Sequence, residues 1–261
     1  MTRPYVFGTN FKMNQTPPES AAFYRQLAAS ISIPPEARVF IFPPFTSLAA
    51  VTEAAEGGPA NLWVGAQNVH WAADGAYTGE ISLRMLQDLG VDIVLLGHAE
   101  RRQIFLERDV DLNKKVRAVL DAGLRILFGI GETAEERGYG VSNETILRQL
   151  KIGLHGVEAS QLERVNIAYE PVWSIGAGGT PATPADVEPI AATVRAALGE
   201  LFGAAGSAVP ILYGGSVDPK NAGTFTGLPN VDGLLVGRAG WAVESFVATF
   251  ESGLAGYLGK A

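Results

Sequence analysis

Short apolar runs rich in β-branched and aromatic residues recur along the whole chain and predict eight strands. The runs are Tyr5–Phe7, Val39–Phe42, Leu62–Val64, Ile93–Leu96, Ile126–Phe128, Val165–Tyr169, Ile211–Tyr213 and Leu234–Val236. Most of them lack an alternation of polar and apolar positions. That pattern is typical of strands that are buried on both faces of a parallel sheet.

Segments with helical periodicity lie between these runs. They are Glu19–Ser30, Asp109–Ala122, Thr145–Leu154, Ala185–Phe202 and a last helix from about Trp241 to Leu258. Eight strand-plus-helix units in 261 residues average about 33 residues each, which is enough for a strand and its crossover helix. We therefore expect a single domain over residues 1–261 with a closed (β/α)8 barrel, and an open doubly wound sheet is the alternative.

Charge and composition exclude several classes of function. The formal net charge is −7 (20 basic against 27 acidic residues), which argues against a nucleic-acid partner and against an anionic membrane surface. Cysteine is absent, so disulfides, thiol nucleophiles and cysteine-ligated metals are excluded. The first residues carry no apolar segment of a signal peptide, and no run approaches the roughly 18 apolar residues of a membrane span. A cytoplasmic location is predicted.

Polar residues that follow the predicted strands supply the candidate chemistry. In a parallel barrel these residues meet at the carboxyl ends of the strands. Lys12, His98 and Glu170 are ionisable, and glycine-rich turns that could hold a phosphate follow the last three strands. Each of these residues alone also fits a structural role. Together they favour proton abstraction beside the carbonyl of a sugar phosphate.

Several motifs in a fixed order resemble the triosephosphate isomerase family along nearly the whole chain. They are Asn10–Asn14, Gly65–Asn68, Gly75–Ser82, Gly97–Arg102, Ala168–Trp173, Tyr213–Val217 and Asp232–Gly237. The resemblance implies that Glu170 is the base and that His98 polarises the carbonyl as a neutral imidazole. It also implies that Lys12 offsets the phosphate and enediolate charge, that Asn10 binds near the carbonyl, and that Glu100 supports this group from behind.

The resemblance also implies a phosphate site beneath a mobile lid. Gly176 in the lid, Ser216 and Gly237 would contact the phosphate, and Tyr213 would hold the closed lid. Neither a metal nor an organic cofactor is implied, and His70, His98 and His155 have no metal-ligand spacing.

The segment from about Gln67 to Ser82 resembles the family's loop that inserts into a second subunit. Thr78 would lie near the catalytic lysine of that subunit, and Glu80 would pair with Arg101. A homodimer is therefore predicted.

Several positions depart from the family pattern and leave alternatives open. Ala99 stands where a serine is usual, the lid Ile175–Pro181 is longer and has no lysine, and Arg238 replaces a glycine near the phosphate. We count Arg238 among the phosphate-binding candidates. One alternative is a paralogue that isomerises erythrulose 1-phosphate in erythritol breakdown, and another is a barrel that binds a phosphorylated metabolite without catalysis.

Overall fold

A computed structural model describes residues 3–176 and 178–260 of the chain. Eight parallel strands form a closed barrel in chain order, and β1 pairs with β8 to complete it. The strands are β1 (Tyr5–Asn10), β2 (Ala37–Phe42), β3 (Leu62–Ala66), β4 (Ile93–Leu96), β5 (Arg125–Ile130), β6 (Val165–Tyr169), β7 (Ile211–Tyr213) and β8 (Gly233–Val236). The (β/α)8 prediction is confirmed, and the open sheet is wrong.

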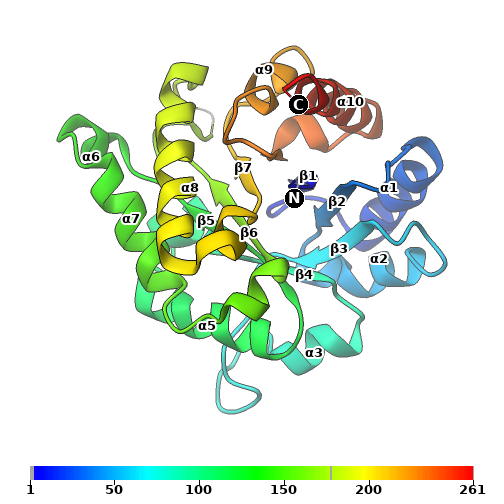
Figure 1. Ribbon diagram of the computed structural model, residues 1–261. Coiled ribbons are helices and arrows are strands. Elements are labelled where there is room, and N and C mark those ends of the chain that lie inside the picture. The colour runs from blue at the N-terminus through cyan, green and yellow to red at the C-terminus, as the bar shows by residue number, and fades with distance from the viewer. Residues whose placement is uncertain (1–2, 177, 261) are drawn as a thin grey trace.

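Helices surround the barrel (Figure 1). They are α1 (Pro17–Ser30), α2 (Leu48–Ala54), α3 (Leu83–Asp88), α4 (Ala99–Gln103), α5 (Asp109–Asp121), α6 (Ala134–Gly138), α7 (Ser142–Gly153), α8 (Pro184–Ser207, kinked at Gly203), α9 (Ala222–Thr226) and α10 (Val243–Gly259). Short 3-10 turns are η1 (Phe45–Ser47), η2 (Ala159–Arg164), η3 (Val172–Ser174) and η4 (Arg238–Gly240). None of the helices in the described residues is both long and apolar enough to span a membrane.

The boundaries of some predicted elements shift. Asn10 is the last residue of β1 rather than part of the loop after it. The last helix begins at Val243, because Trp241 belongs to the segment between η4 and α10. These shifts are small, but they matter for the site, since both residues reach the same cavity.

Two layers of apolar side chains explain why the strands lack alternation. Phe40 and Phe42 of β2 point into the barrel, where they join a cluster with Trp63 and Leu127. The intervening Ile41 points outward into the larger cluster between the barrel and the helices. Both faces of each strand are therefore removed from water, as parallel sheets require.

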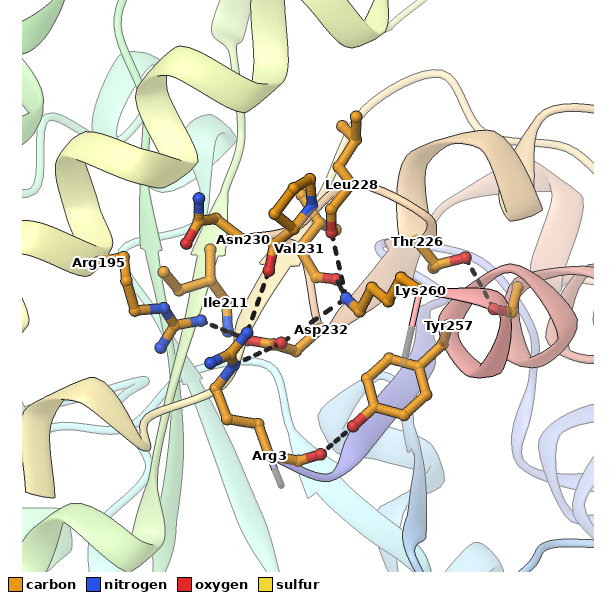
Figure 2. Close-up of polar contacts among 12 residues, drawn as sticks. Arg3, Arg195, Ile211, Thr226, Leu228, Asn230, Val231, Asp232, Tyr257 and Lys260 are labelled. Carbon is orange, nitrogen blue, oxygen red and sulfur yellow. Dashed lines mark hydrogen bonds and ion pairs between the residues drawn. The ribbon is translucent and has the colours of Figure 1, made fainter. Parts of the chain in front are cut away.

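An ionic cluster closes the amino-terminal end of the barrel (Figure 2). The fully buried carboxylate of Asp232, just before β8, accepts hydrogen bonds from Arg3 Nε (2.7 Å), from the Ile211 backbone N–H (3.0 Å) and from Arg195. The ammonium of Lys260, at the end of α10, lies 3.8 Å from the same carboxylate. Burial lowers the pKa of Lys260 to about 8. The cluster ties both ends of the described chain to the barrel.

Candidate active site

A cavity of about 560 Å³ opens at the carboxyl ends of the strands. It is lined by eight of the residues singled out in the sequence, which are Asn10, Lys12, His98, Glu170, Gly176, Ser216, Gly237 and Arg238. These residues come from segments up to 228 positions apart in the chain. Closure of the barrel places them around one opening.

Glu170 lies at the centre of this cavity, immediately after β6. Its backbone N–H continues the ladder by donating to Ile130 O (2.7 Å), which fixes the start of its side chain. The side chain is only 2% exposed, and its Oε2 accepts a hydrogen bond from the Ala99 backbone N–H (2.8 Å). Its Oε1 lies 3.7 Å from His98 Nε2. A carboxylate held this way, with one oxygen directed toward an imidazole, is suited to act as a base.

His98 caps α4, and this position defines its hydrogen bonding. Nδ1 accepts from the backbone N–H of Glu100 (3.2 Å), so this nitrogen presents a lone pair. In the neutral imidazole the proton then belongs on Nε2, the nitrogen near Glu170. His98 can therefore donate a hydrogen bond to a carbonyl oxygen from Nε2.

Lys12 contributes a positive charge to the cavity. Its Nζ lies 2.6 Å from Glu100 Oε1, and its backbone N–H donates to Asn10 Oδ1 (2.8 Å). Lys12 has φ of 54°, in the left-handed region that a residue with a side chain rarely adopts. Glu100 therefore lies directly beside Lys12, and its role in supporting the site stays a prediction.

The glycine-rich turns after β6, β7 and β8 also line the cavity. Ser216 Oγ donates to Ser174 O (3.0 Å), which joins the turn after β7 to the lid. Tyr213 is fully buried beneath them, with its hydroxyl 3.4 Å from Ser174 Oγ, and burial raises its pKa. Of the lid Ile175–Pro181, Ala177 lies outside the described residues.

Sequence reasoning assigned no role to Glu132, which anchors the base of the lid. This carboxylate is 1% exposed and accepts hydrogen bonds from Trp173 Nε1 (2.8 Å) and from the Tyr169 hydroxyl (3.1 Å). Burial and the adjacent carboxylate raise the pKa of Tyr169, so its hydroxyl stays a donor. Arg137 covers the Trp173 ring at 3.8 Å. The signal available in the sequence was the position of Glu132 two residues after the end of β5.

No individual role was predicted for Gln67, which lies in the motif Gly65–Asn68. Its Nε2 donates to Lys12 O (2.8 Å) and to Phe42 O (3.0 Å), and it thereby bridges the segment after β1 to the end of β2. Gln67 therefore binds the carbonyl of Lys12, whereas Asn10 binds its N–H.

The three residues predicted for a subunit contact lie away from the cavity. Thr78 and Glu80 are exposed in a segment without helix or strand. Arg101 pairs with Glu107 of its own chain (2.8 Å). The pair of Glu80 with Arg101 stays a prediction.

A base, an N–H donor and an ammonium around one cavity, next to glycine-rich turns, define a class of barrel enzyme that moves protons on an anionic substrate. The described residues contain no group of three or more His, Asp or Glu side chains that could hold a metal ion.

Comparison with known proteins identifies the family within this class. The sequence model of the family "Triosephosphate isomerase" matches residues 5–252. Triosephosphate isomerase of Carboxydothermus hydrogenoformans is 45% identical over 97% of this chain and 100% of its own length. Those of Acetivibrio thermocellus (42%; 94% and 97% covered) and Moorella thermoacetica (43%; 95% and 98% covered) are similar to it as well. The chain belongs to the triosephosphate isomerase family and is an isomerase, which confirms the resemblance seen in the sequence.

Proposed function

We propose that this enzyme interconverts dihydroxyacetone phosphate and glyceraldehyde 3-phosphate by proton transfer through an enediolate. The observation that carries the proposal is the distance of 3.7 Å between Glu170 Oε1 and His98 Nε2 at one wall of the cavity. Names of relatives that match nearly the full chain support the same reaction.

In the proposed reaction Glu170 removes a proton from the carbon beside the carbonyl of the bound ketose. The electrons of that C–H bond form the enediolate C=C bond, and those of the C=O bond move to the oxygen. His98 donates a hydrogen bond from Nε2 to this oxygen, where negative charge develops. The proton of the hydroxyl on the deprotonated carbon then moves to the former carbonyl oxygen, and Glu170 returns its proton to the former carbonyl carbon. The electrons of the C=C bond form the new C–H bond, and the electrons left by the departing hydroxyl proton form the aldehyde C=O bond, which yields the aldose phosphate. Lys12 stabilises the added negative charge, and Asn10 binds beside it.

The phosphate is proposed to lie against the turns after β6, β7 and β8. Gly176, Ser216 and Gly237 would contact it, and Arg238 would add a positive charge at the rim. The contact of Tyr213 with Ser174 and that of Glu132 with Trp173 support the segment that directly precedes the lid. Closure of the lid excludes water and protects the enediolate from loss of phosphate.

We also propose a homodimer built around the segment between Gln67 and Ser82. Large apolar side chains next to residues that contact this segment are exposed in the single chain. Met13 (96%) follows Lys12, which Gln67 contacts, and Phe105 (61%) and Leu106 (76%) precede Glu107, which Asn68 contacts. Exposed apolar residues that gather in this way indicate a protein interface. Light scattering after size exclusion tests this, and a Phe105→Asp variant should be monomeric.

The cytoplasmic location stays a prediction from the sequence.

Product analysis in D₂O tests the reaction itself. Starting from dihydroxyacetone phosphate, the enzyme should form glyceraldehyde 3-phosphate with deuterium at the carbon beside the aldehyde, as seen by ¹H NMR. The proton that Glu170 carries exchanges with solvent, and this is why the label appears. Erythrulose 1-phosphate is tested in parallel. A higher kcat/KM for the four-carbon substrate, or binding of both phosphates without turnover, would overturn the proposal.

A further inference from the structure

The indole of Trp241 makes a contact that the reaction outlined above does not use. Trp241 lies directly after η4, is half-buried and lines the cavity. Its Nε1 donates a hydrogen bond to the backbone carbonyl oxygen of Asn10, 3.0 Å away. The indole N–H is the only hydrogen-bonding group of a tryptophan side chain, so this contact sets the orientation of the ring.

The contact continues the junction between β8 and β1 beyond the end of the ladder. Register between these strands runs only to Thr9 opposite Val236, and Asn10 is the next residue. A Cβ on Gly240 would lie 2.5 Å from Thr9 Oγ1, so only glycine lets η4 approach β1 this closely. Trp241 is therefore seated against the end of β1 by the packing of the residue before it.

The segment that Trp241 holds contains a disfavoured backbone conformation. Lys12 has φ of 54°, and the turn from Asn10 to Lys12 needs outside contacts to keep this shape. Asn10 Oδ1 binds the Lys12 N–H, and Gln67 Nε2 binds the Lys12 carbonyl. Trp241 binds the Asn10 carbonyl. Side chains thus bind the Lys12 N–H and the carbonyls of both Asn10 and Lys12.

Displacement of the Asn10 peptide would move the Lys12 ammonium, which faces the cavity beside Glu100. We propose that Trp241 is a positioning residue that holds the end of β1 so that Asn10 and Lys12 meet the anionic substrate. The inference rests on the proposed function, because it assigns Lys12 the task of binding that substrate. Trp241 acts through its N–H, and the size of the ring is secondary.

Two variants separate the N–H from the ring. Trp241→Phe removes the donor and part of the volume. Incorporation of benzothienylalanine at position 241 replaces the N–H by sulfur and keeps the volume. Both should lower kcat/KM for glyceraldehyde 3-phosphate about three- to tenfold, the usual worth of one hydrogen bond. Both should weaken inorganic phosphate binding, measured by ³¹P NMR titration, by a similar factor.

Phe246→Leu is the control for a structural effect, since Phe246 lies in α10, packs on Phe7 and Phe23, and is not among the residues that line the cavity. It should lower Tm and leave kcat/KM unchanged at 25 °C. In a Lys12→Met background, Trp241→Phe should change kcat/KM by less than twofold, because the ammonium that Trp241 positions is then absent.

Unchanged kcat/KM and phosphate affinity in the sulfur variant, or full additivity with Lys12→Met, would overturn the inference. If the unaltered chain fails to turn over triose phosphates, the proposed function falls. The phosphate titration, which needs no turnover, then still decides the role of Trp241.

Discussion

Asp232→Asn is expected to reduce stability strongly while leaving catalysis nearly intact. Asp232 is fully buried and is the carboxylate around which Arg3, Arg195 and Lys260 gather. An asparagine has nearly the same shape, but it removes the negative charge. The amide NH₂ group would also face N–H donors. In one orientation of the amide the donor is Arg3, and in the other the donors are Arg195 and Ile211.

The size of the effect follows from the burial of the partners. The side chains of Arg195 and Lys260 are 13% and 14% exposed, so water screens their uncompensated charges poorly. Removing one partner of a buried ion pair costs about 3–5 kcal/mol. For a chain of this size each kcal/mol corresponds to roughly 2–4 °C, so Tm should fall by about 10 °C.

Thermal unfolding followed by circular dichroism at pH 7 measures this loss, at one protein concentration because subunit association would shift Tm. Asp121→Asn is the control, since Asp121 is exposed and accepts a hydrogen bond from Gln161 at the surface, so Tm should change little. Because Asp232 precedes β8 while the cavity residue Gly237 follows it, kcat/KM at 25 °C should stay within twofold. A Tm equal to that of the control, or a tenfold loss of kcat/KM with Tm unchanged, would refute the reasoning.

Three further outcomes are expected. Glu170→Gln should lower kcat by about 10²–10⁴-fold and leave Tm unchanged, since the amide oxygen still accepts from the Ala99 N–H. Glu163 is exposed, and the control Glu163→Gln should change neither quantity. Equal kcat values for Glu170→Gln and the unaltered enzyme would contradict the assignment of Glu170 as the base. The free energy of unfolding, from urea titrations, should rise from pH 8 toward pH 10. Burial lowers the pKa of Lys260 to about 8 in the folded protein, so in this range Lys260 is neutral when folded but still protonated when unfolded. Above pH 10 the free energy of unfolding should fall again, because burial raises the pKa of tyrosines such as Tyr5 and they lose their protons more easily in the unfolded chain. The Lys260→Met variant should not show the rise between pH 8 and pH 10. The same rise in that variant would contradict the assignment of this effect to Lys260. Gly131→Ala should unfold at lower temperature and lose activity, since the new Cβ would lie 1.9 Å from Glu170 O; a variant with normal Tm and kcat would contradict this packing.

The strands and the long helices were predictable because local sequence encodes them. Runs such as Ile93–Leu96 are apolar at consecutive positions and therefore on both faces of a strand, so they predict buried parallel strands. The end predicted for one helix at Phe202 lies next to the kink at Gly203, where φ is 63°. Short helices such as α4 and α9 were missed, since five residues hold too little periodicity to detect.

The sequence places Glu170, His98 and Lys12 shortly after predicted strands. That placement predicted that the three residues meet at the carboxyl ends of the strands, and all three line one cavity. Motif order indicated the family, and the comparisons confirm it. These features follow from residue type and spacing, which need no knowledge of distant contacts.

Contacts between distant segments were out of reach of any local pattern. The eight units favoured closure of the barrel, but an open sheet would use the same runs of apolar residues, and the pairing of β1 with β8 decides between the two. The Trp241 bond to Asn10 spans 231 positions, and the Arg3 bond to Asp232 spans 229. A donor and an acceptor so far apart carry no shared periodicity, and only the folded barrel brings them within 3.0 Å.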